Sequence, residues 1–355
     1  MALLVTGGAG FIGSNFIIDC IKNFNEKVIN LDKLTYAGNL ENLSEVKDNS
    51  NYQFIEGDIL DSSLVNEIFA KYKPSAVVHF AAESHVDRSI DNPNNFLQTN
   101  IIGTFNLLES SKIYWDNLAK TEKLKFRFLH ISTDEVFGSL SEQDEPFSED
   151  NRFEPNSPYS ASKASSDHLA RAWNRTYGLP IITTNCSNNY GPYQFPEKFI
   201  PLMILNALEN KKLPIYGDGN YIRDWIYVKD HCDAIFKILK LGAVGENYNI
   251  GGENQKKNID IVNQICNILD ELKPRSDQKS YKNLITFVKD RPGHDRRYAI
   301  NANKISKELK WKPKETFNTG LQKTISWYLS NETWVKGVQN RGYKDWIKKK
   351  YSFDK

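Results

Sequence analysis

Two short motifs in the middle of the chain carry side chains that can move protons. The first is Tyr159-x-x-x-Lys163, whose spacing predicts a phenol and an ammonium on one face of a helix. The second is Thr133-Asp134-Glu135, a hydroxyl and two adjacent carboxyls that follow an apolar run. A tyrosine beside a lysine can take a hydroxyl proton while hydride leaves the same carbon, and two carboxyls in different environments can divide acid and base roles. The motifs therefore indicate chemistry that couples oxidation to proton transfer.

A glycine-rich turn near the start of the chain predicts a dinucleotide site. Gly7, Gly10 and Gly13 follow the apolar run 2–6 and open a helical pattern. Glycine there permits a tight turn and lets a pyrophosphate approach the helix N-terminus closely. Asp32 ends the next apolar run, where a carboxylate accepts hydrogen bonds from ribose hydroxyls and repels a 2′-phosphate. Although Asp32 could instead be a turn residue or helix cap, its position favours NAD over NADP.

Each proton-transfer motif has an ordinary structural alternative. Tyr-x-x-x-Lys often marks only a helix surface, and Asp134 and Glu135 could cap the segment after their strand. Downstream of a dinucleotide fold both motifs become catalytic candidates, because ligands bind at the C-terminal ends of the strands in such sheets. We then expect the pKa of Tyr159 to be lowered by the nearby Lys163 and by a cationic nicotinamide.

Apolar runs alternate with helical patterns through the first half of the chain. Strands are expected at 2–6, 28–31, 52–56, 76–80, 126–132 and 181–185, and helices between them include 62–71, 95–112 and 160–177. Such alternation predicts βαβ units with right-handed crossovers. We expect an α/β fold in which an NAD-binding Rossmann domain with a doubly wound parallel sheet spans 1–185. A smaller C-terminal substrate-binding lobe spans 186–355, and the chain returns to the main sheet at about 225–255.

The glycine turn and the Tyr159/Lys163 motif together resemble the extended branch of the short-chain dehydrogenase/reductase superfamily, which acts on nucleotide sugars. Within that branch, residues 129–138 resemble the Thr-Asp-Glu signature of the dTDP-glucose 4,6-dehydratases. The likeness covers the chain to about Leu329. It includes stretches similar to that family's nicotinamide loop, sugar and phosphate loop and nucleotide-binding segments, at 81–89, 188–198, 214–217, 221–225, 258 and 291–295.

The resemblance implies a set of site residues. The catalytic ones would be Thr133, Asp134, Glu135, Tyr159 and Lys163. The NAD contacts would be Gly7, Gly10, Phe11, Ile12, Gly13, Asp32, Lys33, Asp58, Ile59, Ala81, Ala82, Thr99, Tyr159, Lys163 and Asn189. The substrate contacts would be Ser84, Thr133, Asn188, Lys198, Phe199, Pro214, Tyr216, Arg223, Asn258, Arg291 and His294. The guanidinium of Arg223 suits a diphosphate, and its alternative is a surface ion pair with Asp224.

The resemblance also implies a reaction on a nucleotide sugar: oxidation at C4, loss of water across C5–C6 and return of hydride to C6. Thr133 would bond O4, Tyr159 would take its proton, Glu135 would remove the C5 proton and protonated Asp134 would assist the departure of O6. The alternatives are a UDP-glucose 4,6-dehydratase, a UDP-sugar 4-epimerase or UDP-glucuronate decarboxylase, and a non-enzymatic NAD-sensing protein. An epimerase or decarboxylase does not need the Asp134–Glu135 pair.

Composition argues against several other classes. The net charge is +2 with both signs interspersed, which is unlike a nucleic-acid-binding surface. No apolar run approaches the roughly 20 residues that span a bilayer, and we expect no signal peptide before the glycine turn. The six histidines and four scattered cysteines show no metal-ligand spacing. We expect a cytoplasmic enzyme without a metal. The resemblance implies a homodimer through helices 95–112 and 160–177, whose apolar faces could equally pack within the domain.

Overall fold

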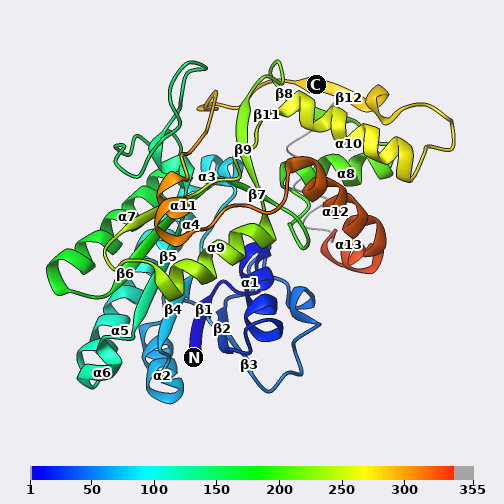
Figure 1. Cartoon of the computed structure of the whole chain (residues 1–355). Coiled ribbons are helices and arrows are strands. Elements are labelled where there is room, and N and C mark those ends of the chain that lie inside the picture. The colour runs from blue at the N-terminus through cyan, green and yellow to red at the C-terminus, as the bar shows by residue number, and fades with distance from the viewer. Residues whose placement is uncertain (1, 340–355) are drawn as a thin grey trace.

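The main body is a seven-stranded parallel sheet with helices on both faces (Figure 1). The computed structural model describes residues 2–339. The strands lie in the order β10-β6-β5-β4-β1-β2-β3, and each neighbouring pair is parallel. Their bounds are β1 (Ala2–Thr6), β2 (Lys27–Asp32), β3 (Tyr52–Glu56), β4 (Ala76–His79), β5 (Arg127–Thr133), β6 (Ile181–Cys186) and β10 (Asn247–Ile250). The predicted doubly wound parallel sheet is confirmed.

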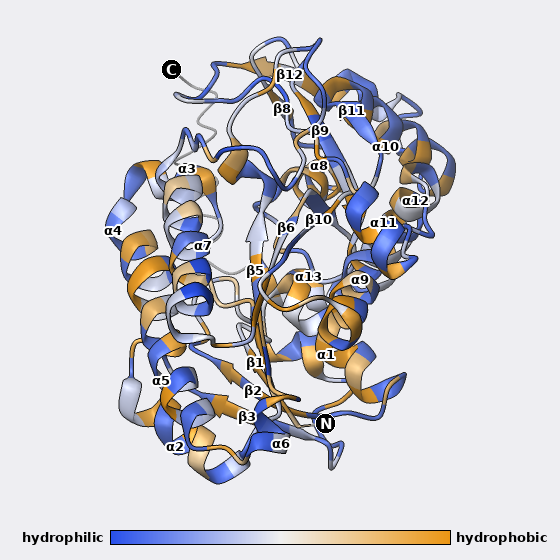
Figure 2. Ribbon diagram, turned by 60° about the vertical axis from the view of Figure 1, so that its left-hand side comes forward, coloured by the Kyte–Doolittle hydropathy of each residue, from blue (hydrophilic) through white to orange (hydrophobic). Residues whose placement is uncertain are grey.

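Alternate residues of these strands pack against opposite layers of helices. In β1, Leu4 belongs to the core beneath one layer, whereas Leu3 and Val5 belong to the core beneath the other. The first layer consists of α2 (Ser62–Tyr72), α5 (Thr104–Asp116) and α7 (Pro158–Tyr177). The second consists of α1 (Phe11–Lys22), α9 (Val228–Leu241) and α11 (Asn303–Leu309). Figure 2 shows the hydrophobic strands between these layers. Because both faces of the sheet are covered, its strands are almost continuously apolar.

The helical stretch expected over 95–112 is helical throughout, but it is not one regular α-helix. This part of the chain forms α4 (Pro93–Phe96), a π-helix (Leu97–Gly103) and then α5. In the π-helix, the Asn100 side chain donates to the carbonyl oxygen of Glu83 at 3.0 Å and to Oγ of Ser162 at 2.8 Å. The wider π turn thus coincides with hydrogen bonds that join the loop after β4 to α7, which a hydrophobic pattern does not reveal.

The C-terminal part of the chain builds a smaller lobe with its own core, at the upper right of Figure 1. Its sheets are β7 (Asn188–Tyr190) with β9 (Ile222–Tyr227) and β11 (Gln255–Lys257), and β8 (Leu213–Tyr216) with β12 (Ile285–Val288). Its main helices are α8 (Phe199–Leu208), α10 (Asn258–Leu272), α12 (Phe317–Ser330) and α13 (Glu332–Val338). The chain leaves this lobe through α9 and re-enters the main sheet where β10 pairs with β6. The end of the expected lobe, 340–355, lies outside the described residues.

Short helical segments occupy the loops. They are η1 (Leu40–Leu43), α3 (Val86–Asp91), α6 (Lys120–Lys123), η3 (Asp134–Phe137) and η4 (Tyr281–Leu284). Of these, α3 and η3 matter most for the site, because each begins just after a strand of the main sheet and carries acidic side chains.

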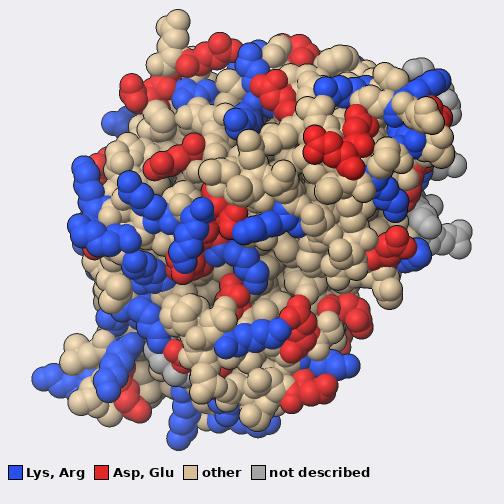
Figure 3. All heavy atoms as spheres, turned by 45° about the vertical axis from the view of Figure 1, so that its right-hand side comes forward, with Lys and Arg blue, Asp and Glu red and all other residues tan. Residues whose placement is uncertain are grey.

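The surface carries charges of both signs. Figure 3 shows lysines and arginines interspersed with acidic residues on the face it presents, in keeping with the net charge of +2. Among residues 2–339, no helix is long and apolar enough to cross a membrane.

Candidate active site

A cavity of about 310 Å³ opens over the C-terminal ends of the main strands, where β1 and β4 lie side by side. At this point the strand order reverses, which is where open α/β sheets bind ligands. All residues predicted to contact NAD line this cavity. So do the predicted catalytic and substrate residues Thr133, Glu135, Tyr159, Lys163, Ser84, Asn188 and Lys198.

The glycine turn leaves no room for larger side chains. A Cβ on Gly7, whose φ is +72°, would lie 2.6 Å from the backbone nitrogen of Ala81, and one on Gly13 would lie 2.4 Å from the carbonyl oxygen of Gly7. The glycine backbone is therefore closely packed on the side that faces the protein and open on the side that faces the cavity. This is a cradle that fits a pyrophosphate at the N-terminus of α1.

Asp32 both organises the glycine turn and lines the cavity. Its carboxylate accepts hydrogen bonds from the backbone nitrogens of Ala9 and Leu34, both at 2.8 Å, so it organises the turn, while the residue also lines the cavity. Burial raises its pKa, and these two hydrogen bonds lower it. Nearby, Lys33 and Asp58 form an ion pair of 2.5 Å.

Helix α7 holds Tyr159 and Lys163 in the predicted relation. Ser157 caps its N-terminus by accepting from the nitrogen of Ser160, Pro158 starts the helix, and Gly178 ends it with φ of +74°. One turn apart on the same face, Tyr159 and Lys163 both line the cavity. The Lys163 ammonium donates to the carbonyl oxygen of Ile131 on β5 at 2.8 Å.

The expected lowering of the Tyr159 pKa is wrong for the protein groups by themselves. Burial raises the pKa of Tyr159 well above its ordinary value, the charge of Glu135 raises it further, and only the hydroxyl of Thr133 is a lowering influence. Burial likewise lowers the pKa of Lys163, and the charge of Asp167 opposes this lowering. The expectation weighed neighbouring charge and neglected desolvation, which dominates in an enclosed site.

The adjacent carboxyls Asp134 and Glu135 have different surroundings. Burial raises the pKa of Asp134 well above its ordinary value, and Glu135 and Asp224 add to this effect. Oδ2 of Asp134 has no hydrogen-bond partner within residues 2–339. Burial also raises the pKa of Glu135, but Arg291, Arg223 and Lys198 all oppose that change. The surroundings therefore favour the protonated form more strongly at Asp134 than at Glu135.

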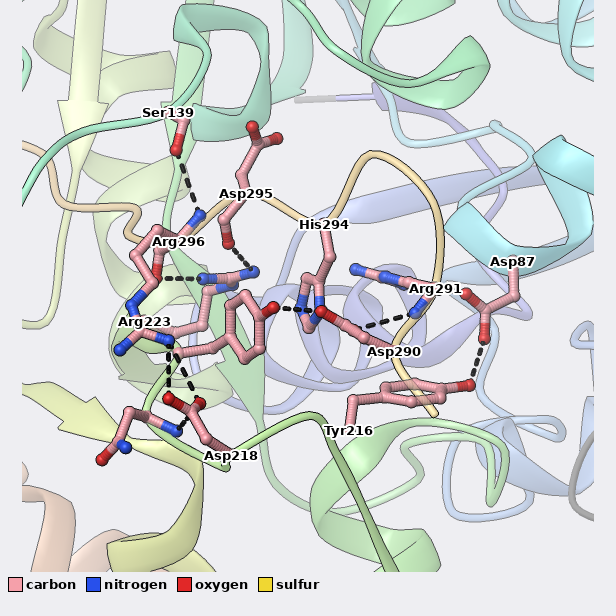
Figure 4. Close-up of polar contacts among 12 residues, drawn as sticks. Asp87, Ser139, Tyr216, Asp218, Arg223, Asp290, Arg291, His294, Asp295 and Arg296 are labelled. Carbon is pink, nitrogen blue, oxygen red and sulfur yellow. Dashed lines mark hydrogen bonds and ion pairs between the residues drawn. The ribbon is translucent and has the colours of Figure 1, made fainter. Parts of the chain in front are cut away.

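The small lobe supplies positive charge above this pair. Asp87 on α3 accepts from Arg291 at 2.9 Å and from the hydroxyl of Tyr216 at 3.1 Å, which joins the main domain to the lobe (Figure 4). The ring of His294 stacks on Tyr221 with centroids 3.8 Å apart. Burial, then Arg291 and Arg223, lower the pKa of His294 to about 4, so this ring is neutral near pH 7.

Arg223 does not form the surface ion pair considered as its alternative. It is 6% exposed and donates to the carbonyl oxygen of Asp295 at 2.8 Å. The neighbouring Asp224 instead accepts from the backbone nitrogens of Gly252 and Asn254. The guanidinium also lies 4.3 Å from the ring centre of Tyr298. Arg223 is thus an oriented, buried cation.

The predicted catalytic residue Asp134 does not line the cavity, and neither do seven predicted substrate residues: Phe199, Pro214, Tyr216, Arg223, Asn258, Arg291 and His294. Phe199 stacks on Trp225 at the start of α8, Pro214 lies within the β8–β12 sheet, and Asn258 begins α10. Conversely, sequence reasoning missed acidic and aromatic lining residues. Glu197 pairs with Arg88 at 2.8 Å, and that guanidinium lies 3.9 Å from the ring centre of Tyr36. The only signal for Glu197 was its place beside Lys198 in the 188–198 loop.

The described part of the chain holds no cluster of three or more His, Cys, Asp or Glu residues able to bind a metal ion. The four cysteines are buried free thiols.

Comparison with known proteins agrees with this geometry. Residues 4–324 match the family described as GDP-mannose 4,6 dehydratase. The dTDP-glucose 4,6-dehydratase of Shigella flexneri is 58% identical to this chain over 359 residues, with 99% of each sequence covered. The chain belongs to the dTDP-glucose 4,6-dehydratase family.

Solved structures from the dTDP-glucose 4,6-dehydratase family share this fold. The enzyme from Bacillus anthracis, in complex with NAD, is 48% identical with a TM-score of 0.84, and the match covers 95% of this chain and 99% of that one. The enzyme from Streptomyces venezuelae, with NAD and TYD bound, is 42% identical with a TM-score of 0.86, covering 95% and 100%.

The environment of Asp134 makes a prediction about stability. Burial raises the pKa of Asp134 in the folded state, so as pH rises the unfolded chain loses this proton first. The carboxyl therefore destabilises the fold above the unfolded pKa of about 3.9, and no penalty exists below it. Asp134→Asn mimics the protonated acid, so it should raise the free energy of unfolding at about pH 8 by about 1–3 kcal/mol.

Urea unfolding at about pH 8 and about pH 5 checks this expectation, with the exposed Asp48→Asn as the matched control. The gain in the free energy of unfolding should be smaller at about pH 5 than at about pH 8. The control should show neither this gain nor its pH dependence. A less stable Asp134→Asn protein at about pH 8 would show that the carboxyl is ionised and stabilised in the folded protein.

Proposed function

We propose that this protein is an NAD-dependent dTDP-glucose 4,6-dehydratase that converts dTDP-glucose into dTDP-4-keto-6-deoxyglucose and water. The observation that carries the proposal is the Asp134–Glu135 pair, two adjacent carboxyls with opposed charge environments beside Tyr159 and Lys163. Elimination of water requires both an acid and a base, and this pair supplies them.

The chain's own residues fit NAD. Gly7, Gly10 and Gly13 would admit the pyrophosphate to the N-terminus of α1, and Asp32 would accept from the ribose hydroxyls. When bound, NAD⁺ supplies a hydride acceptor and the positive charge that the protein groups around Tyr159 do not supply. Lys163, fixed by the carbonyl oxygen of Ile131, would hold the nicotinamide ribose.

Tyr159 and Thr133 would act in the oxidation at C4. Thr133 would hydrogen-bond O4 while Tyr159 accepts the O4 proton as the C4 hydrogen leaves as hydride. The Thr133 hydroxyl already caps η3 by accepting from the nitrogen of Glu135 at 3.3 Å. That bond sets the orientation of the hydroxyl relative to the two carboxyls.

The carboxyl pair would act in the elimination of water. A ketone at C4 acidifies the C5 proton, which ionised Glu135 would remove, while protonated Asp134 donates to O6 as it departs as water. Hydride then returns to C6 and a proton to C5, so the cofactor ends unchanged. The cations Arg291, Arg223 and Lys198 keep Glu135 available as a base.

The small lobe would hold the nucleotide diphosphate. Arg223 and Arg291 offer oriented guanidinium groups for the phosphates, and Tyr216 and His294 lie next to them (Figure 4). A UDP-sugar 4-epimerase or decarboxylase would leave the split carboxyl pair without a role, and so would an NAD-sensing protein. A UDP-glucose 4,6-dehydratase shares the same chemistry and differs only in the base that it selects.

We also propose that the protein acts as a cytoplasmic homodimer. Apolar side chains on the π-helix, α5 and the end of α7 are exposed in the single chain, notably Leu97, Ile102, Phe105, Ile113 and Tyr177. They lie on the helices for which the family resemblance implies a dimer interface. A second copy would cover such a patch.

The proposed reaction predicts a specific change of mass. Purified protein incubated with dTDP-glucose, without added reductant, should yield a product lighter by one water in mass spectrometry. UDP-glucose in a parallel incubation should lose water much more slowly. Equal turnover of both sugars would overturn the base preference. An isomer of unchanged mass would indicate an epimerase and contradict the roles of Asp134 and Glu135.

Tyr159→Phe should abolish turnover, because it removes only the oxygen that accepts the O4 proton. The loss should be about 100-fold or more, the scale of a general-base contribution. Absorbance of reduced nicotinamide after mixing with substrate measures the oxidation step directly. Tyr72→Phe, at the C-terminal end of α2 and outside the cavity lining, is the matched control. Normal formation of reduced nicotinamide in Tyr159→Phe would remove Tyr159 from the scheme.

A further inference from the structure

A buried carboxylate lies one helical turn beyond Lys163. Asp167 on α7 is 4% exposed and lies outside the cavity lining. Its Oδ1 accepts from Nε2 of His130 on β5 at 3.0 Å, and its Oδ2 accepts from the amide of Asn185 on β6 at 3.1 Å. One side chain of the helix that carries Tyr159 is thereby tied to two central strands.

The same contacts reach the catalytic end of β5. The amide of Asn185 also donates to the carbonyl oxygen of Thr133 at 3.0 Å, and its Oδ1 accepts from the amide of Asn247 on β10 at 2.7 Å. Lys163 holds the carbonyl oxygen of Ile131 from the other direction. Two carbonyl oxygens at the end of β5 thus accept from the side chains of Asn185 and Lys163, and Asp167 holds the first of these by a hydrogen bond.

The charge of Asp167 opposes the effect of burial on Lys163. The titratable groups that face the ammonium are Asp167 and Tyr159 on α7, His130 on β5, His79 on β4 and Cys186 on β6. The two histidines are neutral, because burial lowers the pKa of each ring. Cys186 and Tyr159 are neutral because burial raises their pKa values. Among these five groups, Asp167 is the largest influence that raises the pKa of Lys163 against the effect of burial.

We infer that Asp167 is a positioning residue for the reaction: its carboxylate balances the charge of Lys163 and locks the end of β5 against α7. The inference rests on the proposed function, in which Lys163 and the Thr133-Asp134-Glu135 segment act on one substrate. A buried ammonium without a counter-charge loses its proton easily, and a nicotinamide cation beside it would increase that tendency. His130 and Asn185 donate to Asp167 as neutral groups, so its negative charge remains available to Lys163.

Charge removal at Asp167 tests the inference. Asp167→Asn and the smaller Asp167→Ser should each move the alkaline limb of the kcat profile to lower pH by about one pH unit or more, because Lys163 then deprotonates sooner. KM for dTDP-glucose should change less than about twofold, since Asp167 does not line the cavity. Asp167→Glu keeps the charge, so its alkaline limb should stay at the wild-type pH. Asn185→Ala, which breaks the tether and keeps the charge, should lower kcat without moving the limb.

A second readout does not depend on turnover. NMR of protein labelled at the lysine Nζ, with Lys163 assigned through Lys163→Arg, follows its protonation directly. The Lys163 pKa should fall in both neutral variants and stay in Asp167→Glu and in the exposed control Asp48→Asn. If the wild-type protein does not convert dTDP-glucose but the Lys163 pKa still falls in the neutral variants, only the proposed function is rejected. An unmoved Lys163 pKa in a folded neutral variant, or unmoved limbs in an active one, would overturn the role of Asp167.

Discussion

The proposed chemistry depends on one electrostatic constraint: two adjacent carboxyl groups at the end of β5, one buried and one partly buried, would have to hold different numbers of protons. Burial by itself would favour the neutral form of both. Asp134 meets further negative charge from Glu135 and Asp224, whereas Glu135 meets Arg291, Arg223 and Lys198. The difference between the two groups therefore comes from which neighbours each one faces, and those neighbours belong largely to the small lobe. A main sheet without the lobe would hold the same residues without the chemistry.

The parallel sheet explains why so few contacts suffice to assemble this arrangement. In a doubly wound sheet the strand ends converge on one edge, so β1, β4, β5 and β6 deliver the glycine turn, residues 81–84, Glu135 and Cys186 to a single cavity. Helix α7 then crosses that edge with Tyr159 and Lys163 on its inner face. Asp87 closes the arrangement by holding Tyr216 and Arg291 of the lobe against the main domain (Figure 4).

Much of this could be predicted from the sequence, because it is local. Three motifs can be recognised because each lies within about ten residues of sequence. They are the glycines in a strand–helix turn, Tyr-x-x-x-Lys on one helix face and an acidic pair after a strand. What could not be predicted depends on distant partners. The ion pair of Arg88 with Glu197 and the π-helix at Leu97–Gly103 require contacts between segments far apart in the chain. The pKa of Tyr159 was mispredicted for the same reason, since desolvation is set by everything that packs around a group.

The central claim is that one site oxidises C4, eliminates water and returns the same hydride to C6. The most direct measurement uses dTDP-glucose carrying deuterium at C4 and locates the label in the product by NMR and mass spectrometry. The account predicts that the deuterium moves to the C6 methyl group and is retained there even when unlabelled reduced nicotinamide cofactor is present in solution. Deuterium that remains at C4, or that is replaced at C6 by hydrogen from solvent or added cofactor, would contradict the account.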